Sequence, residues 1–514
     1  MRTLFAAAVT MACVTALVSQ TPGPARAAEP PEIPTLRPAD LAGLPSKDLA
    51  AWRTILVFAE RGEWDRALAV TGQAKNTELG DVLKWLTLRD PGIPTDFDTV
   101  AAFLDAHPGW PGLQPIYTRA ETLMPKNLSA AKKIAYFERH PPRSTDATVA
   151  YLQALKSEGR TDALATQVRT IWKSIEFSED AQKDFLKSFG SFLTKQDHID
   201  RLDAMLWRGR EGAARHMLEL VPSGWVKLAD ARTRLRYNKA GVDAAVNAVP
   251  KALSEHPGLI YERARWRRQK GLDSAARDLM LGAPGDPEFQ KLLWDERNRL
   301  IRDAIKDRHY EDAYLLAAGH HQVDGIGFAT AEWLAGWVAL RYLDRPKDAF
   351  RHFTVMHGNV GTPISLSRGA YWAGRAAEAM KDKAALTEWY GKAAEHGTTF
   401  YGQLAAARLG KEEPPLALDG WPTKEQVVAF QNLGPIRVAT QLLRIGHKEL
   451  AERFLFAVYR DMNEETGAIL LADMALKSGL PKVAVFTARR AGRLGASLVE
   501  RGYPVIDLDQ NIGP

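Results

Sequence analysis

Cysteine is almost absent from this chain: a single one, Cys13, occurs among 514 residues. It lies in an apolar run that extends from Leu4 to Val18. We interpret residues 1–27 as a secretory signal peptide, because Arg2, this short run and the small residues before a cleavage point near Ala27 form its three parts. The exported chain would then have no cysteine, which excludes a disulfide scaffold, a thiolate nucleophile and a cysteine-ligated metal site.

Long apolar runs are also missing. The run at 4–18 is shorter than the ~20 residues that cross a bilayer, so an uncleaved anchor helix is the weaker alternative. We therefore predict an exported, periplasmic protein with no membrane span after signal cleavage. The formal net charge of +6 comes without a block of lysines or arginines, which argues against nucleic acid but suits an anionic polymer.

The familiar catalytic and cofactor motifs do not occur. The sequence has no G-x-x-x-x-G-K-S/T phosphate loop, H-E-x-x-H pair, G-x-S-x-G elbow or glycine-rich dinucleotide turn. The histidine pairs His320-His321 and His352/His357 have spacings that suit a metal poorly, and we predict surface or helix-end histidines. We accordingly predict no nucleotide, no metal and no cofactor.

One carboxylate pair, Glu464-Glu465, could be considered for acid–base chemistry on a glycosidic bond. Such chemistry needs two carboxyl groups that face each other across a sugar, or one buried carboxyl group with a raised pKa. Neighbouring residues on one helix provide neither arrangement. We predict a solvated helix start here, and no catalytic residue.

Tryptophan, in contrast, is plentiful, with 14 residues. Indole faces stack well on sugar rings, but four of these tryptophans recur at the spacing of a helix core, which favours packing between helices. Trp110 and Trp421 are flanked by glycine and proline, so we predict that they are more exposed and remain candidates for ligand contact. The tryptophans at core spacing are Trp333, Trp337, Trp372 and Trp389.

Helical periodicity is present almost everywhere after a proline-rich leader at 28–46, and strand alternation is almost absent. The segment that contains Trp333 recurs at Trp372, 39 residues on, and Phe353 recurs at Tyr390, 37 residues on. Spacings of this size are typical of helix pairs in tetratricopeptide-like α-solenoids. We predict an all-α fold with a superhelical domain.

The domain boundaries follow from composition. We assign 47–410 to the superhelical domain and 411–502 to a small helical linker domain, because prolines, charges and a Gly-Trp-Pro turn interrupt the helices near 411–422. The linker domain includes helical stretches at Leu442–Leu455 and Ala468–Leu476. Residues 503–514 form a short tail.

The stretch Ser365–Gly410 resembles a signature of the soluble lytic murein transglycosylases, above all at Arg368, Tyr371-Trp372 and Phe400–Ala405. The resemblance implies a ring-like superhelix and a helical linker domain, followed by a lysozyme-like catalytic domain. That family cleaves the bond between N-acetylmuramic acid and N-acetylglucosamine without water and leaves a 1,6-anhydromuramoyl end. Further similar pieces are Phe103–Glu121, Asp197–Trp207, Tyr261–Lys270 and Glu332–Arg341.

The catalytic part of the family pattern has no counterpart. Tyr503-Pro504 resembles the passage into the catalytic domain, yet only ten residues follow, and no Glu-Ser pair or G-L-M-Q segment occurs. We therefore carry over no catalytic residue and expect no cleavage by this chain alone. We expect a peptidoglycan-associated scaffold, with its glycan-binding residues unassigned. The alternatives are an adaptor for periplasmic protein partners and a truncated fragment of an active transglycosylase.

Overall fold

A computed structural model describes residues 46–73, 76–411, 422–462, 464–494 and 498–504. The predicted signal peptide, most of the leader, most of the tail and the predicted boundary near 411–422 lie outside these ranges. Within them every regular element is a helix, which confirms the predicted all-α fold. In the described part of the chain, no helix is both long and apolar enough to span a bilayer.

The first part of the chain forms short helices joined by turns. Single-turn 3₁₀ helices lie at Thr71–Gln73, Gly190–Phe192, Leu218–Leu220 and Lys251–Leu253. The α-helices are α1 (Ser46–Glu60), α2 (Trp64–Val70), α3 (Thr77–Arg89), α4 (Phe97–Ala106), α5 (Gln114–Leu123), α6 (Ala130–Arg139), α7 (Thr145–Ser157), α8 (Thr161–Ser174), α9 (Glu179–Phe189), α10 (Lys195–Trp207), α11 (Glu211–Arg215), α12 (Ser223–Arg236), α13 (Val242–Asn247) and α14 (Pro257–Gln269).

Longer and more regular helix pairs follow, and then a group of C-terminal helices. They are α15 (Asp273–Leu281), α16 (Pro287–Lys306), α17 (Tyr310–Ala318), α18 (Gly325–Arg341), α19 (Pro346–Gly358), α20 (Pro363–Ala379), α21 (Lys383–Ala394), α22 (Phe400–Arg408), α23 (Lys424–Gln431), α24 (Gly434–Arg444), α25 (Lys448–Asp461), α26 (Glu465–Lys477), α27 (Pro481–Leu494) and α28 (Val499–Gly502).

One local prediction needs correction, and one helix start has a defined cap. The stretch Leu442–Leu455 is not one helix, because Gly446 adopts a φ of 81° and separates α24 from α25. Helix α20 is capped by Thr362, whose hydroxyl accepts a hydrogen bond from the Ser365 N–H at 3.3 Å. Ser365 and Ser367 both lie inside the helix.

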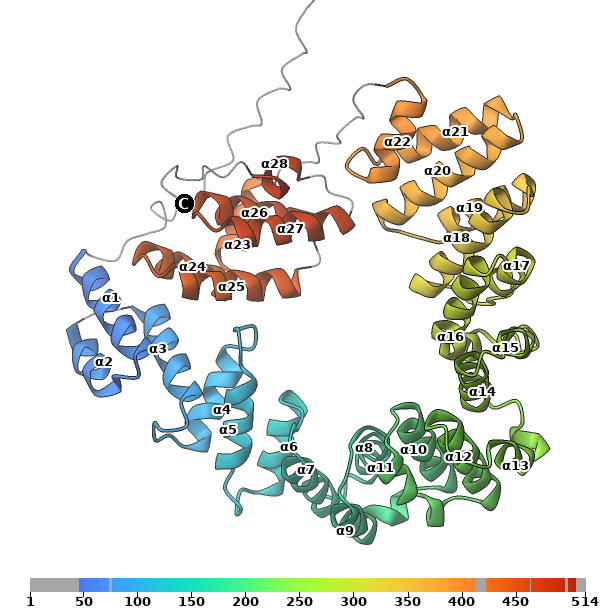
Figure 1. The fold of residues 1–514 in the computed structure, drawn as a ribbon. Coiled ribbons are helices and arrows are strands. Elements are labelled where there is room, and N and C mark those ends of the chain that lie inside the picture. Colours follow the sequence, from blue (N-terminus) through green and yellow to red (C-terminus); the bar gives the residue numbers. More distant parts are fainter. Residues whose placement is uncertain (1–45, 74–75, 412–421, 463, 495–497, 505–514) are drawn as a thin grey trace, which may run out of the picture.

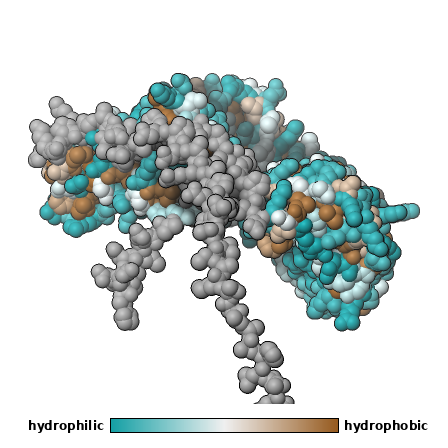
Figure 2. Space-filling model, turned by 90° about the horizontal axis from the view of Figure 1, so that it is seen from above, coloured by the Kyte–Doolittle hydropathy of each residue, from teal (hydrophilic) through white to brown (hydrophobic). Residues whose placement is uncertain are grey.

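The helices stack into a curved superhelix that bends round to form a ring (Figure 1). Along the right-hand arc, α14, α16, α18 and α20 lie on the inner side, and α13, α15 and α17 lie on the outer side. Helices α23–α28 fill the space between the two ends of the arc. Seen from above, the surface is mostly hydrophilic, with separate hydrophobic patches on both arcs (Figure 2).

The predicted repeat is confirmed by matching contacts in successive helix pairs. In the pair α18/α19, the ring of Phe353 packs directly onto Gly336; in α20/α21, the ring of Tyr390 packs onto Gly374. A Cβ atom at either glycine would lie less than 3.0 Å from that ring. The glycines therefore allow the two helices of each pair to approach closely.

Replacing Gly374 by alanine should destabilise the fold by about 1–3 kcal/mol, because overpacking a buried aromatic contact forces side chains or backbone to shift. The added Cβ would lie 2.6 Å from Cδ1 of Tyr390. Gly391→Ala in α21 is the matched control, because nothing lies within 4 Å of its Cβ position. We expect this control to be neutral or stabilising. Thermal unfolding of the two variants compares them, and equal melting temperatures would contradict the packing argument.

Arginine side chains join neighbouring helices by capping their C-terminal carbonyl groups. Arg201 donates to the carbonyl oxygens of Trp172 and Ile175 at the end of α8. Arg297 donates to Met280 O at 2.8 Å and Leu316 O at 3.0 Å, at the ends of α15 and α17. A cation at a helix C-terminus satisfies free carbonyl groups and complements the helix dipole. Burial lowers the pKa of Arg297 to about 10, so it stays charged at neutral pH.

The ring is closed on one side by an aromatic cluster. Phe454 of α25 lies against Trp85 of α3 and Trp110 of the α4–α5 loop, with ring centroids 5.5 and 4.8 Å apart. Arg53 of α1 donates to Ile445 O at 2.7 Å across the same seam. One continuous hydrophobic core includes both the N-terminal helices and α23–α27. On the opposite side, α20 meets α27.

Candidate functional site

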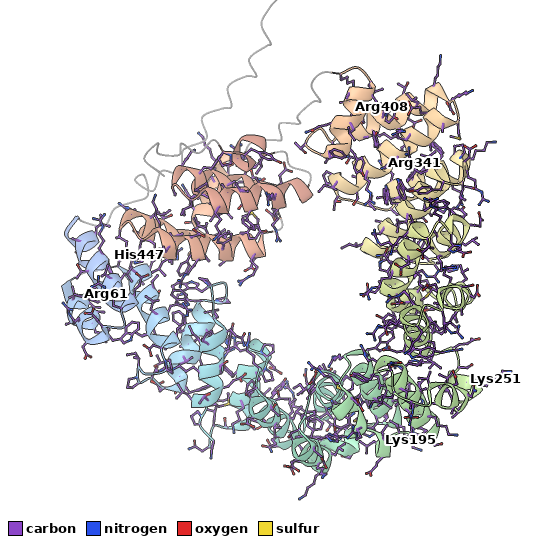
Figure 3. All side chains as sticks on the ribbon, in the orientation of Figure 1. Arg61, Lys195, Lys251, Arg341, Arg408 and His447 are labelled. Carbon is purple, nitrogen blue, oxygen red and sulfur yellow. The ribbon has the colours of Figure 1, made fainter. Side chains whose placement is uncertain are left out.

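The inner face of the right-hand arc carries a stripe of large side chains on α18. Most of this helix is buried, but Thr330, Trp333, Trp337 and Leu340 stay partly exposed at steps of three and four residues, and Arg341 follows at the end. Helix α18 belongs to the inner row of the arc (Figure 1), and this stripe is a part of its surface that the neighbouring helices leave partly uncovered. Figure 3 shows side chains that reach into the opening of the ring along this arc.

Residues of α20 complete a cluster around Trp333. The Trp333 and Trp337 rings are stacked with centroids 5.6 Å apart, and Trp372 meets Trp333 edge-on at 6.1 Å. The guanidinium carbon of Arg368 lies 3.9 Å from the centre of the Trp333 ring. We call Trp333, Trp337, Arg368 and Trp372 the tryptophan–arginine cluster.

Three donor groups of this cluster are enclosed without a hydrogen-bond partner among the described residues. They are the indole N–H groups of Trp333 and Trp372 and the Nε–H of Arg368. Burial lowers the pKa of Arg368; Tyr401 opposes this shift and the charge of Arg302 adds to it. The cluster thus combines partly exposed indole rings with a cation, a set that suits a saccharide bearing carboxylate groups.

The tryptophans predicted to pack between helices do so, and the structure divides them into two groups. Trp333, Trp337 and Trp372 lie at the partly exposed inner face, packed against the core below them. Trp389 of α21 is not part of this cluster: it packs edge-on against Phe350 and His357 of α19. The spacing predicted packing for each, but it did not reveal that three of them meet at one surface.

The prediction for Trp110 is wrong. Its side chain is only 4% exposed, because Phe454 and Phe103 enclose it at the ring seam. Trp421 lies outside the described residues. The prediction of a helix start at Glu464-Glu465 is confirmed: Glu464 immediately precedes α26 and is exposed, and Glu465 is its first residue.

The prediction of surface or helix-end histidines holds for His321 and for His357 in the last turn of α19, but it is wrong for His320 and His352, which are buried. His320 and His352 meet at Glu332: His320 Nε2 lies 3.2 Å from Oε1, and His352 Nδ1 lies 2.6 Å from Oε2. Burial disfavours the carboxylate, but hydrogen bonds and charge from both histidines outweigh this and lower the pKa of Glu332 to about 2. His321 is exposed and His357 lies within α19.

The remaining contacts of this triad show why it is structural. The backbone N–H of Gln322 donates a hydrogen bond to His320 Nδ1 at 3.0 Å. The ring proton of His320 is therefore on Nε2, and this N–H donates a hydrogen bond to Glu332. The Tyr314 hydroxyl and Arg351 lie 3.4 and 3.2 Å from His352 Nε2. Every group is engaged with a neighbour. In the described part of the chain, no group of histidine, cysteine or acidic side chains could hold a metal ion.

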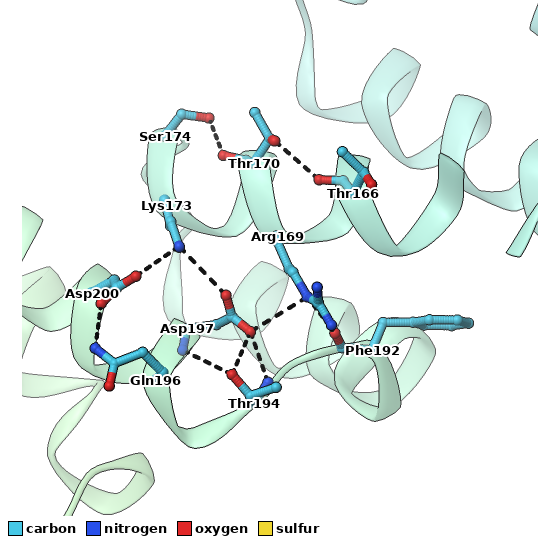
Figure 4. A network of polar contacts seen from close by, with 10 residues as sticks. All are labelled: Thr166, Arg169, Thr170, Lys173, Ser174, Phe192, Thr194, Gln196, Asp197 and Asp200. Atoms are coloured by element: carbon cyan, nitrogen blue, oxygen red, sulfur yellow. Dashed lines mark hydrogen bonds and ion pairs between the residues drawn. The ribbon is translucent and has the colours of Figure 1, made fainter. Parts of the chain in front are cut away.

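A second buried carboxylate, Asp197 of α10, is equally engaged (Figure 4). It forms a capping box with Thr194 and lies 3.5 Å from Lys173 and 3.6 Å from Arg169 of α8. Burial raises its pKa, but the bonds from Thr194 and Lys173 prevail, so the pKa lies below its usual value. A paired carboxylate whose pKa is lowered anchors the helix start and is unsuited to general acid catalysis.

Sequence reasoning missed Glu332 and Arg368 as members of these sites. A signal for Glu332 is present, since it is a charged residue on a helix face where Phe328, Ala331 and Ala335 are apolar. A buried charge of this kind needs partners, and the nearby histidines could have been tested against it. Arg368 stands out in the sequence only through the resemblance at Ser365–Gly410, and its contact with Trp333 could not be predicted because it depends on the stacking of α18 and α20.

Comparison with known proteins supports the fold alone. No family model and no curated protein matches the sequence. Among solved structures, an inactive mutant of the lytic transglycosylase Slt from Pseudomonas aeruginosa matches with a TM-score of 0.66 and 15% identity, over 88% of this chain and 72% of that chain. The 70 kDa soluble lytic transglycosylase from Escherichia coli matches with a TM-score of 0.50 and 14% identity, over 90% and 73%. The chain therefore has the all-α superhelical fold of these lytic transglycosylases, as the resemblance in sequence predicts.

Proposed function

We propose that this chain is an exported, peptidoglycan-associated scaffold that binds glycan strands at the tryptophan–arginine cluster. The observation that carries the proposal is the pair of stacked, partly exposed indole rings of Trp333 and Trp337, with the guanidinium group of Arg368 beside them. Peptidoglycan offers both sugar rings and carboxylates, which match these two kinds of group. The signal-peptide pattern at 1–27 supports export. The overall positive charge favours an anionic polymer.

Replacing Arg368 by glutamine should weaken binding to purified sacculi by about tenfold, because the charge-assisted contact to a carboxylate is lost. Binding is measured by co-sedimentation across a range of sacculus concentrations. The matched control is Lys392→Gln, which removes a cation 4.0 Å from the centre of the Trp389 ring, away from the cluster. Equal affinities of the two variants, with both proteins folded by circular dichroism, would contradict the proposed site.

We further propose that this chain binds glycan without cleaving it. The motivation is that none of its 514 residues forms a Glu-Ser pair or a G-L-M-Q segment. Incubation of the pure protein with sacculi should release no 1,6-anhydromuropeptides, as measured by mass spectrometry. Detection of these products at a rate that scales with protein concentration would refute this part of the proposal and leave the binding site unaffected.

A second candidate function, an adaptor for protein partners, rests on a different observation. Large apolar residues are exposed at the first turns of the successive inner helices α18, α20 and α22, namely Ile326, Ile364 and Phe400. They recur 38 and 36 residues apart, so each repeat presents one, and Ile326 is 87% exposed. Cross-linking in cells compares the candidates: binding to the wall without a partner favours the scaffold, and a partner without wall binding favours the adaptor.

A further inference from the structure

A pocket unrelated to the tryptophan–arginine cluster lies at the closed seam of the ring. Its volume is about 420 Å³, which falls in the range of small-ligand sites. Most of its lining comes from the C-terminal helices, and Gly109 of the α4–α5 loop contributes from the N-terminal side. The pocket therefore spans two parts of the chain that are more than 300 residues apart in sequence.

The walls of the pocket are largely apolar. They include Phe430 of α23, Leu433 and Pro435 at the start of α24, and Val458 and Met462 at the end of α25. Leu433 is 45% exposed although it is a large apolar residue. An apolar cavity of this size favours a ligand with a hydrocarbon or aromatic group.

Two carboxylates, Asp461 and Glu464, provide the charge of the pocket. Asp461 lies 3.1 Å from Arg460, in an exposed contact between neighbouring residues that contributes little. Glu464 stands before α26, and its side chain makes no capping hydrogen bond. Among the described residues that line the pocket, none is basic. Arg490 of α27 donates to Met462 O at 2.7 Å and so adjoins the pocket, but the charged side chains that line the pocket are Asp461 and Glu464.

We propose that this pocket binds an organic cation, in which a primary ammonium group is joined to an apolar group of about the size of a phenyl ring. The ammonium group would lie between Asp461 and Glu464, and the apolar group would contact Val458 and Met462. A bound ligand would also touch the loop at Gly109 and so hold the two sides of the seam together.

The test uses the full chain and three probes with one apolar body: 2-phenylethylamine, 2-phenylethanol and 3-phenylpropionate. Chemical shifts of ¹³C-methyl methionine report binding, and the Met462 signal is assigned through Met462→Leu. We expect the amine to shift the Met462 methyl signal and to bind about five- to tenfold more tightly than the carboxylate. The double change Asp461→Asn and Glu464→Gln should remove this preference.

A pair of variants at Gly467, on the first turn of α26, separates the pocket from nonspecific binding. The Cβ position of Gly467 is 3.5 Å from Met462 Cε, an ordinary contact, so Gly467→Ala should fold and bind. Gly467→Phe should fill the pocket and abolish the shift. The proposal would be overturned if the amine and the carboxylate bound with equal affinity, or if the Met462 signal did not shift. It would also be overturned if folded Gly467→Phe bound the amine as tightly as the wild type. None of these outcomes bears on glycan binding at Arg368.

Discussion

Replacing Phe454 by alanine should lower the free energy of unfolding by about 3–5 kcal/mol and loosen the ring. Its side chain is fully buried, and its ring packs edge-on against Trp85 and Trp110. Truncating a buried phenylalanine removes its transfer free energy and leaves a cavity between the three rings. Because Phe454 joins α25 to the N-terminal helices, the loss falls on the contact that closes the ring.

Two measurements on Phe454→Ala check this expectation. Denaturant unfolding gives the change in stability, and small-angle X-ray scattering should show a larger radius of gyration when the seam opens. The control is Phe486→Ala in α27, whose side chain is 43% exposed and faces Phe456. If both variants lost the same stability, or if Phe454→Ala were destabilised without any expansion, the seam would not depend on this residue.

The polar contacts across the seam are weaker supports. Arg437 lies 3.5 Å from Glu78, and His447 lies 3.3 Å from Glu60. Partly exposed pairs of this kind contribute about 0–1 kcal/mol. Arg53 adds a hydrogen bond to the end of α24. The aromatic core therefore determines whether the ring stays closed, and these pairs determine how the surfaces align.

How far the sequence predicts this structure depends on how local each feature is. The helices and the repeat that relates Trp333 to Trp372 follow from spacings within 40 residues, and they are confirmed. The burial of Trp110 could not be predicted, because Phe454 comes from 344 residues further along the chain. Similarly, the tryptophan–arginine cluster arises only when α18 and α20 stack. Periodicity shows which face of a helix packs but does not identify the neighbouring helix.

The pairing of His320 with His352 is the most informative failure. We rejected each histidine pair because its spacing suits a metal poorly, and that argument considered each pair by itself. It overlooked the convergence of residues from different elements. Glu332, on α18, accepts one hydrogen bond from His320, which precedes α18, and another from His352 on α19. In a solenoid, polar residues on buried faces should therefore be tested against the neighbouring repeat.

We expect the charge of Glu332 to stabilise the fold at neutral pH and to lose this effect in acid. The pKa of Glu332 is about 2 in the folded protein, below the value of about 4.3 for an exposed glutamate in an unfolded chain. A lowered carboxyl pKa stabilises the fold above the unfolded value, and this stability is lost as the pH falls towards the folded value. The difference corresponds to about 3 kcal/mol at neutral pH.

Glu332→Gln should therefore be about 3 kcal/mol less stable than the wild type at pH 7, and the gap should shrink between about pH 4.5 and pH 2. Denaturant unfolding at several pH values measures this gap. Glu311→Gln is the control, because Glu311 is exposed, pairs with Arg345 at 3.0 Å and should cost at most about 1 kcal/mol. Protonation at low pH removes the charge of Glu332 in the wild type and leaves its packing unchanged. A stability difference that stays constant with pH would therefore show that the charge of Glu332 does not stabilise the fold.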